Sequence, residues 1–244
     1  MVDYKTDKQK MMAQWWKSPL AEAVLKQEKS ILQSLKAYFY GQCQLQIGVE
    51  QNCLPECSHN CQQKVMASSG SLQGKSTALP LKSYSLDTLL LSHELEFSDD
   101  PHQVLREAER VLVADGTLVL CYFNPWSLWG LRRLFSWQDT PPWQGHFYTQ
   151  TRIKDWLALL NFEVIALEKY CYHPPIKSEK WFKRFSPFER WGKRLWPFFS
   201  GASILVATKR SIPLTPITKS WRSKQLFPTG ALANTPLSRE KKHE

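Results

Sequence analysis

A histidine at the end of a predicted buried strand is the residue best placed for acid–base chemistry. His93 directly follows Asp87–Ser92, an apolar run whose length and composition are typical of a strand covered on both faces. Ligands bind at the carboxyl ends of the strands in open α/β sheets, and histidine exchanges a proton near neutral pH. We therefore expect His93 to be a candidate general base. The alternative is a structural histidine that hydrogen-bonds the backbone at the strand end.

Three cysteines and a histidine occur close together and could bind a metal ion. Cys53, Cys57 and Cys61 surround His59, and three thiolates with one imidazole can complete a tetrahedral zinc site. The spacing argues against this interpretation, because paired C-x2-C is the usual zinc motif and no second Cys/His cluster is nearby in the sequence. We therefore predict a thiol-bearing loop and no metal site.

The formal net charge of +10 is concentrated in two parts of the chain. Residues 209–244 hold eight Lys/Arg against two Glu, and residues 174–200 hold seven against two, so the remainder is close to neutral. In 174–200 the basic residues flank an aromatic helical face, which suits an interfacial helix on anionic lipid. The alternative is a helix packed on the sheet. We expect any anionic partner, a membrane surface or a nucleic acid, to make peripheral contact at these two parts. For 209–244, a solubilising tail is the stronger interpretation.

Tryptophans are concentrated in the basic segment 174–200 and in an earlier segment, 124–147. We expect both segments to form a lid or a substrate pocket. The two groups are Trp126, Trp129, Trp137 and Trp143, and Trp181, Trp191 and Trp196.

The order of predicted elements indicates an α/β protein. Ser18-Pro19 is typical of a helix start, and apolar residues at helical spacing then extend a helix to about residue 40. Asp100-Pro101 begins a second helix between two buried strands, 87–92 and 117–123, and a turn is expected at Asp115-Gly116. Strand, helix and strand in this order form a parallel crossover. The remaining predicted elements are strands at 45–49, 64–67, 162–167 and 203–208 and a helix that begins at Thr149 or Thr151.

The stretch from Ala78 to Leu120 resembles the core of class I methyltransferases of the type 11 group. The matching motifs, in order, are Leu79-Pro80-Leu81, Ser85-Leu86-Asp87, His93-Glu94-Leu95, Asp100-Pro101, Leu105-Arg106-Glu107, Arg110-Val111-Leu112 and Asp115-Gly116-Thr117-Leu118. The resemblance implies a three-layer Rossmann-like fold with a mostly parallel seven-stranded sheet and an antiparallel last strand. It also implies the cofactor S-adenosylmethionine (SAM).

The resemblance weakens at the cofactor loop, where family members read D-x-G-x-G-x-G. Here the stretch is 46–52: Gly48 keeps the first glycine, Gln46 replaces the acid, and Glu50 and Asn52 replace the other glycines. Carried over by position, Gln46, Gly48 and Glu50 line the methionine end of the cofactor. In the same way Leu79 packs near adenine, and Ser92 and His93 border the transferred methyl group.

The function that follows from the resemblance is SAM-dependent methyl transfer to a small or amphiphilic acceptor. The alternative is a non-catalytic scaffold whose basic aromatic edge binds a membrane, a nucleic acid or a protein. We expect one domain over residues 1–210, with inserts at about 124–148 and 171–202, and a basic disordered tail over 211–244. The start of the chain lacks the apolar stretch of a signal peptide, so we expect a cytoplasmic protein, with peripheral membrane contact through the basic segment.

Overall fold

The structure is a computed structural model that describes residues 7–56, 61–66, 71–135, 142–172 and 199–210. The basic aromatic segment at 174–198 and the tail from 211 lie outside these ranges, so the predictions made for them stay predictions. No helix among the described residues is long and apolar enough to cross a membrane.

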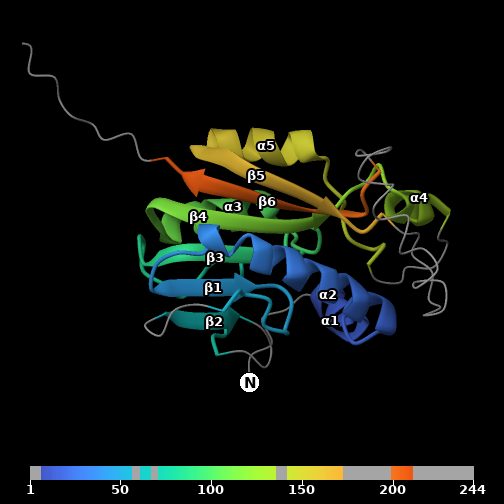
Figure 1. The fold of residues 1–244 in the computed structure, drawn as a ribbon, viewed down its shortest axis with the longest axis horizontal. Coiled ribbons are helices and arrows are strands. Elements are labelled where there is room, and N and C mark those ends of the chain that lie inside the picture. The colour runs from blue at the N-terminus through green and yellow to red at the C-terminus, as the bar shows by residue number, and fades with distance from the viewer. Residues whose placement is uncertain (1–6, 57–60, 67–70, 136–141, 173–198, 211–244) are drawn as a thin grey trace, which may run out of the picture. The chain divides into compact units, whose positions relative to one another are not determined.

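Six strands of the described residues form one mixed sheet in the order β2-β1-β3-β4-β6-β5 (Figure 1). The first four strands in this order are mutually parallel, and β6 pairs antiparallel with both β4 and β5. This arrangement confirms the predicted fold class. The strands are β1 (Cys43–Ile47), β2 (Gln62–Met66), β3 (Leu86–Ser92), β4 (Leu112–Phe123), β5 (Phe162–Tyr170) and β6 (Ala202–Lys209).

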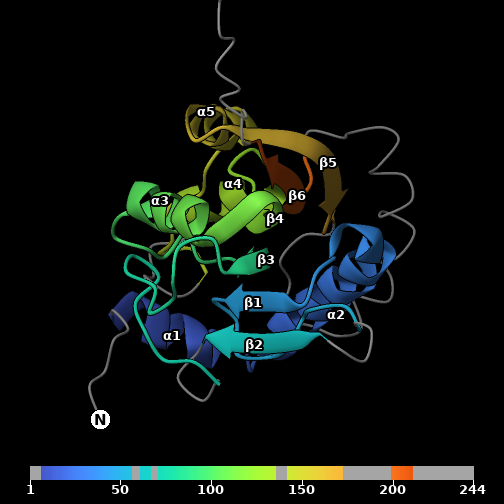
Figure 2. The same ribbon diagram turned by 90° about the vertical axis from the view of Figure 1, so that its left-hand side faces the viewer.

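Helices cover both faces of the sheet, which gives the three layers. Figure 2 shows α2 and α3 on opposite sides of the strands. Leu90, Val119 and Cys121 face the helices α1 and α2, whereas their strand neighbours Leu89 and Leu118 pack with α3 and α5. The helices are α1 (Asp7–Trp15), α2 (Pro19–Ser34), α3 (Pro101–Val111), α4 (Leu128–Phe135) and α5 (Gln150–Leu159).

The structure differs from the sequence predictions in three local features. The described residues form six strands, one fewer than the resemblance implies, and residues 71–78 make only isolated bridges. The helix expected to reach residue 40 ends at Ser34 and continues as a 3-10 turn, Lys36–Tyr38. The turn expected at Asp115 is instead a bulge inside β4. Asp115 adopts a left-handed φ of 60°, and the register between β3 and β4 shifts there, so the chain absorbs the extra residues without leaving the sheet.

Candidate functional site

The ends of β1 and β3 touch through a glycine. Gly48 follows β1 with a left-handed φ of 111°, and a Cβ atom at this position would lie 2.0 Å from the carbonyl oxygen of Ser92. No side chain fits in that space, so only glycine lets the two strand ends meet in this way. The predicted site residues Gly48, Ser92 and His93 therefore lie together at the carboxyl edge of the sheet.

The loop after Gly48 is fixed by the side chain of Gln46. Its Nε2 donates hydrogen bonds of 2.8 and 2.7 Å to the carbonyl oxygens of Val49 and Gln51. Its Oε1 accepts a 2.7 Å hydrogen bond from the backbone N–H of Cys53. Gln46 is fully buried in β1. Its amide group thus bonds to the loop, and the predicted contact of Gln46 with the cofactor stays a prediction.

His93 lies between two buried carboxylates. Its Nε2 is 3.4 Å from Oε2 of Glu28, at ion-pair distance, and its Nδ1 is 3.3 Å from Oε1 of Glu96. Both carboxylates have further donors. Ser92 Oγ donates a 2.9 Å hydrogen bond to Glu28 Oε1, and the backbone N–H of Phe123 donates one of 2.7 Å to Glu96 Oε1.

The electrostatics of this cluster favour a charged histidine. Burial by itself lowers the pKa of His93, but Glu28 and Glu96 outweigh burial and raise that pKa to about 9. Burial likewise tends to raise the pKa of Glu28, but His93 and hydrogen bonds from Cys121 and Ser92 lower it overall. At neutral pH, His93 therefore carries a proton and Glu28 does not. A base role for His93 stays a prediction, and its contacts favour a positioning role.

Aromatic rings enclose His93 and continue toward α4. The His93 ring is 4.1 Å from the Phe123 ring and 5.2 Å from the ring of Trp16, which follows α1. The Phe123 ring stacks at 5.6 Å on Trp129 of α4. Figure 1 shows α1 beyond the carboxyl ends of β1 and β2. The N-terminal helix thus covers this edge of the sheet, a contribution that the sequence analysis missed.

The earlier tryptophan segment is only partly exposed. Trp129 and Trp143 are buried, and the indole N–H of Trp143 donates a 3.1 Å hydrogen bond to the carbonyl of Trp129. Trp126 is 72% exposed. Trp129 and Trp143 therefore belong to the hydrophobic core, and of the three described tryptophans in this segment only Trp126 presents its side chain to solvent. A lid or substrate pocket in this segment stays a prediction. The remaining predicted lid tryptophans, Trp137, Trp181, Trp191 and Trp196, lie outside the described residues.

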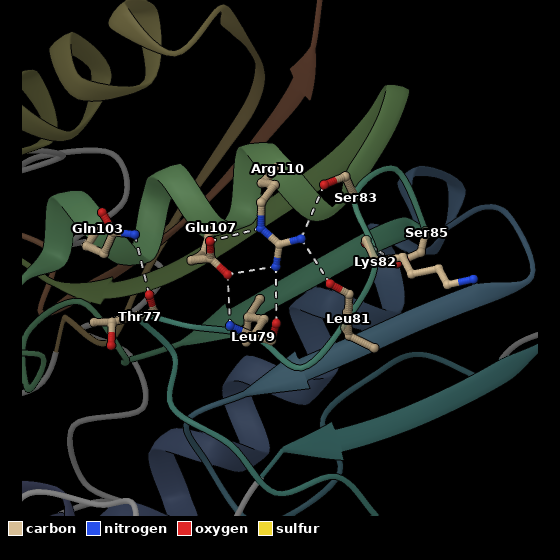
Figure 3. A network of polar contacts seen from close by, with 9 residues as sticks. All are labelled: Thr77, Leu79, Leu81, Lys82, Ser83, Ser85, Gln103, Glu107 and Arg110. Carbon is tan, nitrogen blue, oxygen red and sulfur yellow. Dashed lines mark hydrogen bonds and ion pairs between the residues drawn. The ribbon is translucent and has the colours of Figure 1, made fainter.

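Leu79 is fixed by the predicted Glu107–Arg110 motif, as Figure 3 shows. The backbone N–H of Leu79 donates a 2.8 Å hydrogen bond to Glu107, and its carbonyl accepts one of 3.1 Å from Arg110. Arg110 also donates to the carbonyl of Leu81 and holds Glu107 at 2.8 Å. The Leu79 side chain packs in the core on the α3 face, away from Gln46 and His93. Its contact with adenine stays a prediction.

The cysteines of the predicted thiol loop are only partly described. Cys53 is buried, and burial, reinforced by Glu28, raises the pKa of its thiol. Cys61 is half-buried, while Cys57 and His59 lie outside the described residues. The described residues contain no group of three His, Cys, Asp or Glu that could hold a metal ion.

Comparison with known proteins shows to which family the chain belongs. Residues 35–120 match the model of a methyltransferase domain. The Escherichia coli K12 protein YafS, described as uncharacterized, is 36% identical over 200 residues, which cover 77% of this chain and 78% of YafS. The chain belongs to the SAM-dependent methyltransferase family.

A solved methyltransferase structure shares its fold. A SAM-dependent methyltransferase of Thermotoga maritima aligns with a TM-score of 0.52 at 17% identity, over 81% of this chain and 94% of that one. One from Archaeoglobus fulgidus aligns with a TM-score of 0.49 at 16% identity, over 76% and 94% of the two chains.

The chain carries an acid beside Gly48, Glu94, that was not among the predicted site residues. Glu94 is buried, and its Oε2 lies 3.6 Å from the position that a Cβ atom of Gly48 would take. The residue expected to face the cofactor, Glu50, is half-buried on the loop. Because SAM carries a sulfonium and an ammonium group near its methionine end, a carboxylate beside the glycine turn fits this cofactor. The signal in the sequence was an acid directly after His93 at a strand end.

Proposed function

We propose that this methyltransferase binds SAM with the methionine end against Gly48 and beside Glu94, and transfers the methyl group to a small or amphiphilic acceptor. The observation that carries the proposal is the contact between Gly48 and the Ser92 carbonyl, with a buried carboxylate next to it. SAM supplies an electrophilic methyl group bonded to a positively charged sulfur. The protein's task is to hold the donor and the acceptor in line, which needs positioning more than acid–base power.

Each described group has a part in this arrangement. Gly48 allows the close backbone approach, and Glu94 supplies the opposite charge for the cationic end of the cofactor. The charged His93, held by Glu28 and Glu96, keeps the end of β3 in place. The aromatic wall of Phe123 and Trp129 lies next to it and excludes water.

Isothermal titration with SAM and S-adenosylhomocysteine tests the proposal. We expect micromolar binding of both compounds by the unmodified protein. Glu94→Gln should weaken SAM binding, because it removes the charge beside Gly48. The exposed Asp99→Asn, five residues further on, is the matched control and should leave it unchanged.

The two ligands also locate the charge contact. If Glu94 faces the sulfonium, Glu94→Gln weakens binding of SAM more than binding of S-adenosylhomocysteine, whose sulfur carries no charge. If Glu94 faces the amino group that both compounds share, binding of both weakens equally. If Glu50→Gln lost SAM binding and Glu94→Gln kept it, the charge contact with SAM would be assigned to Glu50 on the loop instead.

The second candidate function is a non-catalytic scaffold. It is favoured by the loop itself, where side chains stand in place of two glycines and Asn52 Oδ1 accepts a 3.0 Å hydrogen bond from the N–H of Leu54. Absence of SAM binding up to millimolar concentration, in folded protein, would contradict the enzyme proposal. Binding to liposomes of anionic lipid or to nucleic acid through the basic segments would then support the scaffold.

A further inference from the structure

We propose that Gln46 holds the cofactor loop in its ligand-binding shape by donating hydrogen bonds, so that the acid typical of the family would open this loop rather than improve it. The inference deepens the proposed function and rests on it for the part that concerns SAM affinity. The part that concerns the loop stands by itself.

The orientation of the Gln46 amide is fixed by its partners. Two of them, the carbonyls of Val49 and Gln51, only accept hydrogen bonds, and the third, the N–H of Cys53, only donates. The NH2 group must therefore face the two carbonyls and the oxygen must face Cys53. The Gln46 side chain thus bonds to the start, the middle and the end of the loop formed by residues 49–53.

A carboxylate cannot make the same set of bonds. An ionised carboxyl group only accepts, so at this position it would keep the bond from Cys53 and turn its other oxygen toward two carbonyl oxygens. Because Gln46 and Val49 are fully buried, water does not screen the repulsion from the Val49 carbonyl, whereas Gln51 is exposed and its carbonyl contributes less. In this chain the carbonyls of Val49 and Gln51 point toward residue 46. Residue 46 must therefore be a hydrogen-bond donor.

The hydrogen bonds of Gln46 also explain how the loop holds its shape without the two missing glycines. Glu50 and Asn52 stand where the family has glycines, so the backbone must follow a path compatible with side chains. Gln46 bonds to residues on both sides of each of these positions. The same side chain therefore fixes the backbone that follows Gly48, against which the methionine end of SAM is proposed to bind.

The experiment compares Gln46→Glu and Gln46→Met with a control, Gln44→Glu. Gln44 is a buried glutamine two residues earlier on the same strand. Its Nε2 donates to the carbonyl of Phe39 and its Oε1 accepts from Gln63, and neither partner belongs to residues 49–53. Hydrogen exchange of the amides of residues 49–54 reports on the loop, and thermal unfolding reports on the fold. SAM affinity is measured by titration between pH 5 and pH 8, as the ratio of each variant to the unmodified protein.

We expect both Gln46 variants to exchange faster in the loop and to bind SAM about tenfold or more weakly at pH 8, since two or more hydrogen bonds are lost. Only Gln46→Glu should recover part of this affinity at pH 5, because its protonated carboxyl group can donate one hydrogen bond. Gln44→Glu should keep the loop protection and affinity of the unmodified protein.

Three results would overturn the inference. They are SAM binding by Gln46→Glu as tight as, or tighter than, that of the unmodified protein at pH 8, unchanged loop exchange in both Gln46 variants, and an equal loss of loop protection in Gln44→Glu. If the unmodified protein binds no SAM, the proposed function fails, and the hydrogen-exchange comparison alone still decides the role of Gln46.

Discussion

The carboxylate of Glu28, in the middle of α2, lies 3.4 Å from Nε2 of His93 at the end of β3. Both side chains are fully buried, and Glu96 approaches the other ring nitrogen. The contact joins the N-terminal helical layer to the edge of the sheet where the cofactor is proposed to bind. Its strength depends on the proton that His93 carries, so it makes the stability of the protein depend on pH.

We predict that this pair stabilises the protein around neutral pH and less so in alkaline solution. The folded-state pKa of His93 is raised to about 9, above its ordinary value, so its contribution is complete at slightly acid pH and is lost as pH rises through about 9. Glu28 has a lowered pKa, so its contribution is lost in strong acid. Urea unfolding at pH 6, 8 and 9.5 measures the alkaline loss.

Replacement of the histidine tests the same relationship. His93→Gln should lower the free energy of unfolding at pH 7 by about 3 kcal/mol, because it leaves two buried carboxylates without their cation. It should also flatten the pH dependence between pH 7 and 9.5. The exposed His102→Gln on α3 is the control. An equally steep alkaline loss in His93→Gln would show that another group titrates.

The sequence predicts more of the fold than of the site, and Glu28 shows why. Apolar spacing and the cap at Ser18 correctly locate the start of α2, and apolar runs locate the strands. Glu28 lies on α2 and His93 follows β3, with β1 and β2 between them in the chain. Spacing in the sequence therefore cannot show that the two residues are partners. One signal was present: Glu28 occupies the apolar face of α2, between the buried Val24 and Leu32. A charge in an apolar stripe requires a buried partner.

The cofactor loop shows the same limit. Comparison by position recognises Gln46 as a substituted acid and Gly48 as the retained glycine, and the structure brings Gly48 to Ser92. The comparison cannot show that the Gln46 amide bonds to the loop, because the direction of the backbone carbonyls is a property of the folded chain. Likewise, residues 112–116 read as a helix end and a turn, but cross-strand pairing with β3 extends β4 through them.

A third prediction concerns the contacts by which Arg110 holds Glu107 and the segment that carries Leu79. Arg110→Lys should lower the free energy of unfolding by about 1 to 2 kcal/mol, because a lysine cannot reproduce the paired contact with Glu107 together with the bonds to the carbonyls of Leu79 and Leu81. Arg106→Lys on the same helix is the control, since Arg106 is exposed and bonds only to Gln103 among the described residues. Equal effects of the two substitutions would contradict a specific clamp.

The last prediction concerns the glycine at the centre of the proposed site. Gly48→Ala should lower the free energy of unfolding by about 1 to 3 kcal/mol and abolish SAM binding, because the new methyl group meets the Ser92 carbonyl at 2.0 Å in a left-handed backbone conformation. Gly116→Ala in β4 is the control: its nearest contact would be 3.0 Å, and its φ lies outside the left-handed region. Urea unfolding and SAM titration of both variants separate strain from cofactor loss. If Gly48→Ala were as stable as Gly116→Ala and still bound SAM, β1 and β3 would not meet as closely as described, and the methionine end would have to bind elsewhere on the edge.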